Sequence, residues 1–244
     1  VQGLMRSCNP LFYDIGWTLY NRNLTAQIAE MSWAFGLGQM TGVGAIQEAP
    51  GNIEVPDTLN NAVDQAIGQS TNLITPLQAA MYTAAVGNGG TLYQPQIIEN
   101  VVGTDGEAVL SFNAQAMGSL PITPETLAAI QEGMRMVTQT PRGTAYRSFA
   151  SAPVPVAGKT GSAENEVGIP HSWFVAYTSA NRDSTPDIAV AVLVAYQGEG
   201  SEWAAPIARR IINYYFNGSL GPIFSWESEY NVPYVPEADE EGEE

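Results

Sequence analysis

Four segments carry apolar residues at the i, i+3 and i+4 spacing of amphipathic helices. The helices that this spacing predicts cover residues 9–20, 24–36, 77–86 and 124–137. Pro76 and Pro124 lie at the starts of the last two, where a first helical turn accepts proline. Gly and Pro recur through residues 42–57, and this punctuation predicts a long loop between the helices.

The second half of the chain is richer in short β-type segments. Two extended segments, residues 96–102 and 107–112, flank Asp105-Gly106, a dipeptide that favours a tight hairpin. Three further strands are predicted at residues 154–159, 172–178 and 187–196. A closing helix over residues 202–216 would turn one apolar side inward, formed by Ile207, Ile211, Ile212 and Tyr215. Helices first and an antiparallel sheet later predict an α+β architecture with the chemistry in a cleft between them.

The composition excludes several classes of protein. The 25 acidic residues oppose 9 Lys and Arg, so the formal net charge is −16 and nucleic-acid binding is disfavoured. Part of this charge lies in an acidic tail, residues 232–244, which is predicted to be disordered. One cysteine, Cys8, and one histidine, His171, do not supply the ligands of a His/Cys metal site, and we expect no cofactor. The apolar stretch at residues 188–195 is too short to span a membrane.

The only lysine of the chain begins the triplet Lys159-Thr160-Gly161, at the end of a predicted strand. A cation beside the hydroxyls of Thr160 and Ser162 can hold a substrate carboxylate. Gly161 leaves room for another group to approach the backbone. The alternative is a solvated lysine in a turn, since Thr or Ser and then Gly follow a given lysine by chance in about one case in a hundred or two.

Ser7 and Asn9 stand two positions apart at the start of the first predicted helix. From there the Ser7 hydroxyl could relay a proton, and the Asn9 carboxamide could hydrogen-bond a peptide amide in the same cleft. The alternative is helix capping, because Ser and Asn are both favoured N-caps and Pro10 suits a first turn.

Ser7-x-Asn9 upstream of Lys159-Thr160-Gly161 resembles the second and third motifs of penicillin-binding proteins and serine β-lactamases. The resemblance covers roughly residues 1–216, in family order. Further segments that carry it are Ile67-Gly68-Gln69, Ile74-Thr75-Pro76-Leu77-Gln78-Ala79-Ala80, Asn88-Gly89-Gly90, Pro95, Gly143-Thr144-Ala145, residues 157–164 and His171-Ser172-Trp173-Phe174. It implies the penicillin-binding protein/serine β-lactamase-like fold: a helical lobe plus an antiparallel sheet flanked by helices, of which this chain carries part.

Two details resemble the class B transpeptidases more than the bifunctional class A enzymes: Glu164 after Lys-Thr-Gly-Ser-Ala, and His171 before Ser-Trp-Phe. The resemblance implies that residues 1–231 are the C-terminal portion of a class B transpeptidase domain. A small β-hairpin insertion is expected at about residues 91–113. His171 is expected to be structural, because nothing near it in the sequence resembles a nucleophile for it to activate.

The family's nucleophile motif, Ser-x-x-Lys, is absent, because the one lysine has Val156 three positions before it. In the family that motif precedes Ser-x-Asn by several tens of residues, whereas six residues precede Ser7 here. We therefore expect the nucleophile, the first strands of the central sheet and a membrane anchor to lie upstream of this chain.

The resemblance implies a peptidoglycan D,D-transpeptidase at the extracytoplasmic face of the bacterial cell membrane. The upstream serine would attack the D-Ala-D-Ala carbonyl of a stem peptide, or a β-lactam, and an amine of a neighbouring strand would accept the acyl group. The backbone N–H of Ser162 would contribute to the oxyanion hole. The implied catalytic residues are Ser7, Asn9, Lys159 and Ser162, and the implied substrate-binding residues are Asn9, Thr160, Gly161 and Ser162.

Two other functions stay open: a D,D-carboxypeptidase or β-lactamase of the same fold, and a non-catalytic sensor that binds penicillin or peptidoglycan. Slow release of bound penicillin would favour the transpeptidase over the hydrolase. For any of the three, we expect Lys159, Thr160 and Ser162 on one side of an edge strand, with Ser7 and Asn9 facing them across a cleft. The Ser7 hydroxyl should then lie within ~10 Å of the Lys159 ammonium.

Overall fold

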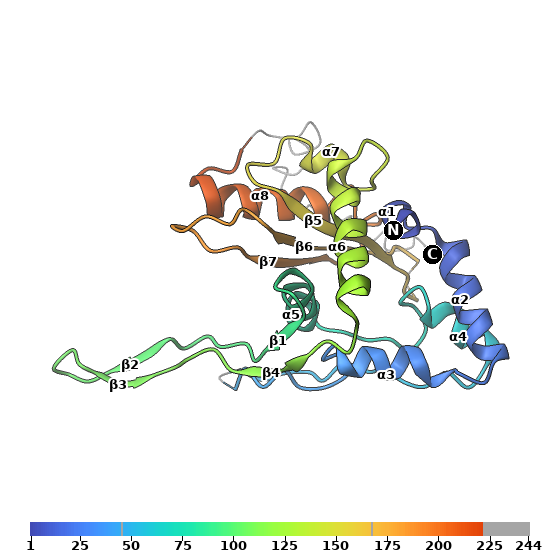
Figure 1. Cartoon of the computed structure of the whole chain (residues 1–244), viewed down its shortest axis with the longest axis horizontal. Coiled ribbons are helices and arrows are strands. Elements are labelled where there is room, and N and C mark those ends of the chain that lie inside the picture. The colour runs from blue at the N-terminus through green and yellow to red at the C-terminus, as the bar shows by residue number, and fades with distance from the viewer. Residues whose placement is uncertain (45, 167, 222–244) are drawn as a thin grey trace, which may run out of the picture.

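The structure, a computed structural model, describes residues 1–221 except 45 and 167 (Figure 1). Its helices are α1 (Gln2–Arg6), α2 (Asn9–Asn21), α3 (Ala26–Ala34), α4 (Leu59–Gln65), α5 (Pro76–Gly87), α6 (Pro124–Gln139), α7 (Tyr146–Phe149) and α8 (Ala204–Asn217). Its strands are β1 (Thr91–Tyr93), β2 (Asn100–Val102), β3 (Ala108–Ser111), β4 (Ala116–Ser119), β5 (Val156–Ala163), β6 (His171–Thr178) and β7 (Ala189–Val194). This order confirms the predicted α+β class.

The four helices predicted from the spacing of apolar residues are confirmed as α2, α3, α5 and α6. Local rules set their starts. The Thr75 hydroxyl accepts a hydrogen bond from the Gln78 backbone N–H, and the Gln78 side chain accepts one from the Thr75 N–H, so a capping box begins α5. Thr123 caps α6 through its hydroxyl. The sequence pattern does not predict α1, α4 and α7, because helices of 5, 7 and 4 residues show too little of a helical period.

The central sheet has the order β5-β6-β7 and is antiparallel throughout. The predicted strands at 172–178 and 187–196 correspond to β6 and β7. β5 begins and ends later than the predicted segment 154–159, because its pairing with β6 continues through Lys159 to Ala163, opposite His171. Within the described part of the chain, β5 is an edge strand.

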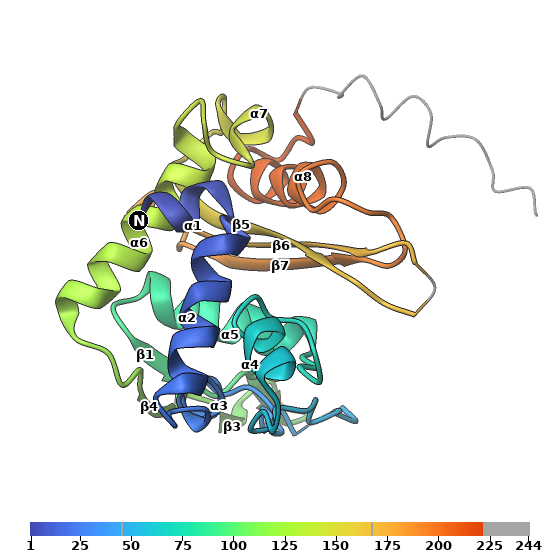
Figure 2. The same ribbon diagram turned by 90° about the vertical axis from the view of Figure 1, so that its right-hand side faces the viewer.

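Helices cover both faces of this sheet (Figure 2). On one face, under α7 and α8, Phe174 is fully buried and its ring stacks on Phe149 with 5.1 Å between centroids. On the other face, Val175 and Tyr177 belong to a second core cluster with residues of α5. Gly87 lets α5 lie close to the sheet, because a Cβ there would be 2.8 Å from the Tyr177 ring. The sheet is therefore held between two apolar cores.

The buried side of α8 differs from the predicted one. Ile212 is fully buried and Ile207 packs against the core, but Ile211 and Tyr215 are 43% and 41% exposed. The inward-facing stripe consists mainly of small residues: Ala204, Ala205, Pro206, Ala208, Arg209, Ile212 and Asn213. The pattern misleads because it assigns the largest apolar residues to the core, whereas a helix packed closely on a sheet has room for alanine there.

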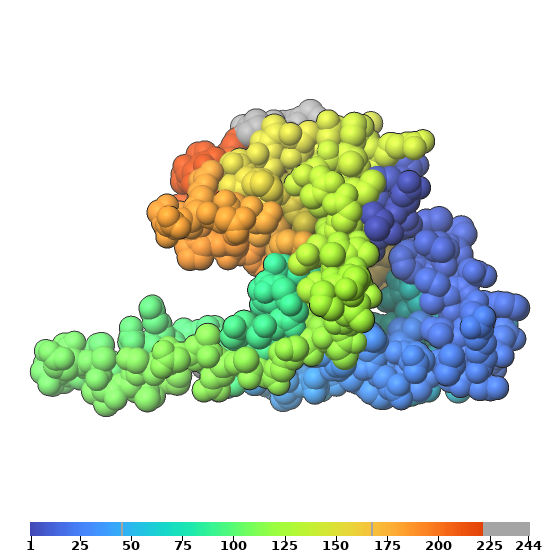
Figure 3. Space-filling model, viewed as in Figure 1, coloured from blue at the N-terminus to red at the C-terminus, as the bar shows by residue number. Residues whose placement is uncertain are grey.

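The hairpin predicted around Asp105-Gly106 is confirmed by the antiparallel pairing of β2 with β3, with Gly106 at φ +83°. The paired ribbon runs past residue 113, because β1 pairs with β4, a strand that the sequence pattern does not predict. The ribbon projects from the rest of the molecule as an arm (Figure 3), and every residue of β2, β3 and β4 is exposed.

Two expectations concern the ends of the chain and membranes. The acidic tail predicted at residues 232–244 lies outside the described residues. None of the helices in the described ranges combines the length and apolar character needed to cross a membrane.

Candidate active site

Ser7 ends α1 and does not open the first helix. Its backbone is left-handed (φ 51°, ψ 52°), and α2 follows with Cys8 as an N-cap that makes no side-chain capping bond. The turn is closed by hydrogen bonds from the Ser7 N–H to the Leu4 carbonyl and from the Cys8 N–H to the Gly3 carbonyl, at 3.2 and 2.9 Å. The capping alternative for Ser7 and Asn9 is therefore wrong. A non-glycine residue in this conformation is strained by about 1–2 kcal/mol, and such strain clusters at functional sites.

Lys159 is the partner of the Ser7 side chain. Its ammonium donates a hydrogen bond to Ser7 Oγ at 2.9 Å, although the two residues are 152 positions apart in the sequence. It also donates to the Thr160 backbone carbonyl. The expectation that the two groups lie within ~10 Å is thus confirmed. The alternative of a solvated lysine in a turn is wrong, because Lys159 is half-buried in the middle of β5.

No acidic side chain in the described part of the chain forms an ion pair with Lys159. Its hydrogen-bond partners, a hydroxyl and a carbonyl, are neutral. Burial lowers the pKa of Lys159 to about 8, because the loss of water disfavours the charged ammonium. At neutral pH the site therefore carries a cation that an anionic ligand could neutralise.

Thr160 and Ser162 lie on the opposite face of β5 from Lys159, because side chains alternate along a strand. Lys159 is paired with Val175, which belongs to the core on the α5 side, whereas Thr160 is paired with Phe174, in the core on the α8 side. The expectation that all three side chains share one side of the strand is therefore wrong.

Thr144 is a residue of the site to which the sequence analysis gives no role. It lies in the loop between α6 and α7, and its hydroxyl oxygen is 2.8 Å from that of Thr160. The neighbouring Gly143 has no space for a side chain, since a Cβ there would lie 2.2 Å from the Val137 carbonyl oxygen. The signal that could have found Thr144 is its place in Gly143-Thr144-Ala145, one of the segments that carry the family resemblance.

One end of the free edge of β5 is covered by α6. The Val156 carbonyl turns outward from the sheet and accepts hydrogen bonds from the Thr138 hydroxyl and the Gln139 side-chain amide. These contacts satisfy a backbone group that an edge strand would otherwise leave without a protein partner.

At the other end of this edge, side chains form hydrogen bonds with the backbone carbonyls of Thr160 and Ser162 and not with their N–H groups. The Thr160 carbonyl accepts from the Lys159 ammonium, and the Ser162 carbonyl accepts from Gln69 Nε2 at 3.3 Å. The N–H and C=O of one residue in an antiparallel strand point to the same edge. The N–H groups of Thr160 and Ser162 therefore also face outward, beside Lys159.

The Ser162 hydroxyl donates to the Glu199 carboxylate at 2.7 Å. Glu199 lies in the loop between β7 and α8, where the next residue, Gly200, is so close to β5 that a Cβ would be 2.5 Å from the Gly161 carbonyl oxygen. The Glu199 backbone carbonyl accepts from the Ser172 hydroxyl at 3.0 Å. This loop places an acid beside residues that are expected to bind a carboxylate, and no local pattern in the sequence signals it.

Asn9 and His171 occupy different surroundings. Asn9 is the first residue of α2, is exposed, and makes no side-chain hydrogen bond within the described residues. His171 accepts a hydrogen bond from the Tyr196 backbone N–H at 3.1 Å and meets the Tyr196 ring edge-on, contacts that suit a structural role. Among the described residues, no group of three or more His, Cys, Asp or Glu side chains could hold a metal ion.

Several known proteins are similar in sequence to this chain. The profile of the family described as "Penicillin binding protein transpeptidase domain" matches residues 1–213. Peptidoglycan D,D-transpeptidase MrdA of Haemophilus influenzae is 28% identical over 265 residues, which cover 98% of this chain and 39% of that protein. Peptidoglycan D,D-transpeptidase PbpA of Mycolicibacterium smegmatis is 30% identical over 226 residues, which cover 86% of this chain and 42% of that protein. The chain thus spans about two-fifths of the length of these relatives.

Solved structures show the same fold. Penicillin-binding protein A from M. tuberculosis, as a ceftriaxone acyl-enzyme complex, has a TM-score of 0.76 and 26% identity, with coverage of 88% of this chain and 48% of that one. Pseudomonas aeruginosa PBP2 in complex with WCK 5153 has a TM-score of 0.73 and 27% identity, with coverage of 95% and 51%. The chain belongs to the penicillin-binding protein transpeptidase family and, within it, to the class B enzymes, of whose transpeptidase domain it carries a part.

Proposed function

We propose that the protein to which this chain belongs is a peptidoglycan D,D-transpeptidase, which cross-links stem peptides through an acyl-enzyme and binds penicillin. The observation that carries the proposal is the 2.9 Å hydrogen bond between Lys159 Nζ and Ser7 Oγ, which joins two motifs 152 positions apart. The match with MrdA, named a peptidoglycan D,D-transpeptidase, covers 98% of the chain and so extends over most of the sequence between and around the two motifs.

In this proposal the nucleophile is a serine outside the chain, since no Ser-x-x-Lys sequence occurs here and the relatives are more than twice as long. The serine oxygen attacks the D-Ala-D-Ala carbonyl, the C–N bond to the terminal D-Ala breaks, and an ester forms. Ser7 relays a proton to the leaving nitrogen, and Lys159 holds the Ser7 hydroxyl in place through their hydrogen bond. Asn9, at the start of α2, hydrogen-bonds the substrate amide.

The free edge of β5 provides the backbone groups for the same reaction. The outward N–H of Ser162 is one oxyanion-hole donor, a contribution of about 3 kcal/mol per donor to the transition state. The extended donor peptide adds to the edge at Thr160 and Ser162, in the manner of an extra strand. Gly161, between them, has no side chain to hold that peptide away.

The terminal carboxylate of the donor, or of a β-lactam, needs donors and a positive charge. We assign it to the hydroxyls of Thr160 and Ser162, with Thr144 beside Thr160 at 2.8 Å and the Lys159 ammonium nearby. The Ser162 hydroxyl donates to Glu199 in this structure. Because two carboxylates repel, the proposal requires the Ser162 hydroxyl to turn from Glu199 to the ligand when one binds.

The proposal also gives a location and partners. The protein would act at the extracytoplasmic face of the bacterial cell membrane, held by an anchor upstream of this chain. Its partners would be stem peptides and β-lactams. Solved relatives from M. tuberculosis include acyl-enzyme complexes with ceftriaxone and imipenem.

Fluorescent penicillin tests the proposal on the whole protein. We expect one covalent adduct per molecule, found by mass spectrometry on a serine outside residues 1–244, because the chain itself carries no Ser-x-x-Lys motif. Boiled protein is the control for non-specific labelling. An adduct on any serine of this chain, or no adduct at all, would contradict the proposal.

The lifetime of that adduct separates the alternatives. A transpeptidase should keep the penicilloyl group for hours. A carboxypeptidase or β-lactamase of the same fold should release that group within minutes, because such a hydrolase positions a water molecule for deacylation. A penicillin-binding sensor module could also keep the adduct, but it would not form cross-links when a stem-peptide donor and an amine acceptor are supplied.

The pH dependence of acylation should follow the Lys159 charge. The ammonium, with its pKa lowered to about 8, is charged at lower pH and neutral at higher pH. Its attraction for the penicillin carboxylate is therefore present at about pH 7 and lost as the pH rises through about 8. The second-order acylation rate constant, measured by stopped-flow fluorescence, should fall about tenfold between about pH 7 and about pH 9.

The matched control for this profile is Lys159→Arg, because arginine stays charged throughout this range. The variant should be slower overall, yet it should lose the decline around pH 8. If the decline persists in the arginine variant, a different group titrates and the assignment to Lys159 is wrong.

A further inference from the structure

Glu199 is held beside β5 by a backbone that is anchored on β6. Its carbonyl accepts hydrogen bonds from the Ser172 hydroxyl at 3.0 Å and from the Glu202 N–H at 3.1 Å. Ser172 is fully buried in β6, and its hydroxyl oxygen also accepts from the Ala204 N–H at 3.1 Å. The next residue, Gly200, is buried against β5. The backbone of Glu199 is therefore fixed in place, and only its side chain is free to turn.

The Glu199 carboxylate is a negative charge without an internal cation. It accepts a hydrogen bond from the Ser162 hydroxyl at 2.7 Å and is exposed to solvent. No Lys, Arg or His side chain forms an ion pair with it in the part of the chain that the structure describes. Lys159 lies on the opposite face of β5 from Ser162, since side chains alternate along a strand. The charge of Glu199 is therefore available to a ligand that reaches the Ser162 hydroxyl.

The position of Glu199 affects any ligand carboxylate that binds to Ser162. If Ser162 turns its hydroxyl to such a ligand, the ligand oxygen lies at most two hydrogen-bond lengths, about 5.4 Å, from the Glu199 oxygen. Two like charges at that distance weaken binding about fourfold even at the dielectric constant of water, and more where the ligand excludes water. The Debye length is about 8 Å at physiological salt, so this repulsion is only partly screened. A positive group on the ligand, next to its carboxylate, would oppose the repulsion.

We propose that Glu199 is a specificity-determining residue of the carboxylate subsite, and that it favours ligands which carry a cation beside the carboxylate. Such a zwitterionic ligand would place its carboxylate on the Ser162 hydroxyl and its cation against Glu199. A ligand whose only charge is the carboxylate would meet the repulsion alone. The inference rests on the proposed function, which assigns the ligand carboxylate to Thr160 and Ser162.

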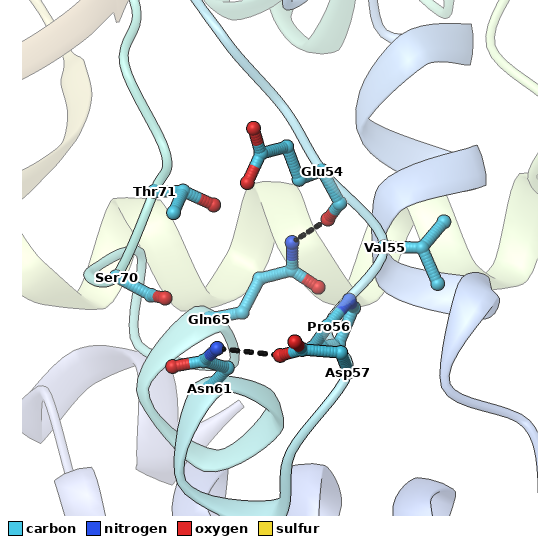
Figure 4. A pocket seen from close by; sticks show the side chains of 8 residues that line it. All are labelled: Glu54, Val55, Pro56, Asp57, Asn61, Gln65, Ser70 and Thr71. Atoms are coloured by element: carbon cyan, nitrogen blue, oxygen red, sulfur yellow. Dashed lines mark hydrogen bonds between the residues drawn. The ribbon is translucent and has the colours of Figure 1, made fainter.

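A separate cavity contains acidic groups that serve as a comparison. It has a volume of about 350 Å³, and its walls carry Glu54 and Asp57 (Figure 4). Its described lining includes none of the residues assigned to the proposed reaction. Both acids are exposed, and Asp57 accepts a hydrogen bond from the Asn61 amide at 2.8 Å. Replacement of Glu54 by glutamine therefore changes the net charge as much as the same replacement of Glu199, at a place outside the subsite.

Two cephalosporins with the same 2-thienylacetyl side chain test the proposal on the whole protein. Cephalothin has an uncharged acetoxymethyl group next to its carboxylate, and cephaloridine has a cationic pyridiniomethyl group at the same position. The second-order acylation rate constant of each is measured by competition with fluorescent penicillin. In the isosteric variant Glu199→Gln, the rate constant for cephalothin should rise about fourfold, whereas that for cephaloridine should stay within about twofold of the parent value. Because each compound is compared with itself, differences in intrinsic reactivity cancel.

Salt provides a second test, which needs no variant. At about 1 M NaCl the Debye length is about 3 Å, which is shorter than the separation of the two carboxylates. The ratio of the cephaloridine to the cephalothin rate constant should then fall in the parent protein to the value of the Glu199→Gln variant. In that variant the ratio should change little with salt, because Lys159 attracts the carboxylate of both compounds alike.

Two control variants separate the contact from the general charge of the protein. Glu202→Gln removes the same charge three positions further along the loop, and Glu54→Gln removes it outside the subsite. Both should keep the rate-constant ratio of the parent protein. An equal change for the two cephalosporins in Glu199→Gln, or no change, would overturn the charge preference. A fall of the same size in Glu202→Gln would overturn the assignment to the contact with Ser162. If neither cephalosporin acylates the parent protein, the proposed function fails instead.

Discussion

Replacement of Lys159 by methionine is expected to slow the acylation of the whole protein by penicillin about 10²- to 10³-fold, the range found when a preorganised electrostatic group is removed from an active site. Methionine has a similar length and no charge. The change removes the hydrogen bond to Ser7 Oγ. It also removes the positive charge that, in the proposed function, attracts the β-lactam carboxylate. The measurement is the second-order rate constant for labelling with fluorescent penicillin.

The same variant should melt at a higher temperature than the parent protein. Lys159 is a half-buried charge without an acidic partner among the described residues, so an apolar side chain of similar shape removes a desolvation penalty. Arg22→Met, which removes an exposed cation, is the matched control and should change neither property. If penicillin acylates the Lys159→Met and Arg22→Met variants at the same rate, Lys159 has no part in the reaction.

Replacement of Phe174 by alanine is expected to lower the free energy of unfolding of the transpeptidase domain by about 3–5 kcal/mol. Phe174 is fully buried in the middle strand, stacks on Phe149, and touches the core under α8, so its removal leaves a cavity on that face. For a domain of this size, the melting temperature should fall by about 10 °C. Differential scanning fluorimetry of the whole protein measures this change.

Leu193→Ala provides the comparison within the same sheet. Leu193 is on the neighbouring strand β7 and is 39% exposed, so the same kind of truncation should cost much less, about 1 kcal/mol or below. Equal losses from the two variants would mean that the cavity under α8 does not limit stability, and that the two faces of the sheet are not packed as described.

Elements with local causes could be predicted from the sequence. Thr75, Pro76 and Gln78 specify the start of α5 within four residues, and Asp105-Gly106 specifies a hairpin turn by its own backbone preference. The family resemblance in turn picked out both halves of the candidate site. Neither source of information could give the contact between them, which depends on the packing of α1 against α6 and of α6 against β5.

What escaped prediction depends on tertiary contacts. Ser7 adopts its left-handed conformation at the end of α1, where the helix packs against the rest of the domain. Serine has no intrinsic preference for left-handed backbone angles, so the sequence does not predict this conformation. Ile211 and Tyr215 are exposed because alanines occupy the side of α8 that lies on the sheet. Glu199 reaches Ser162 across 37 positions, from a loop with no recognisable motif. Each of these three features depends on the element against which the segment packs in the folded domain.

In the proposed function, the cover that α6 places over one end of β5 limits the kind of peptide that can add to this strand. Thr138 and Gln139 occupy the edge at Val156, so a strand added beside Thr160 and Ser162 cannot continue along the edge past Val156. A peptide that continued in both directions would collide with α6. The edge therefore suits a peptide that ends before Val156. Selection for a free terminus would then come from the contacts of α6 at Val156 as well as from recognition of the terminal carboxylate.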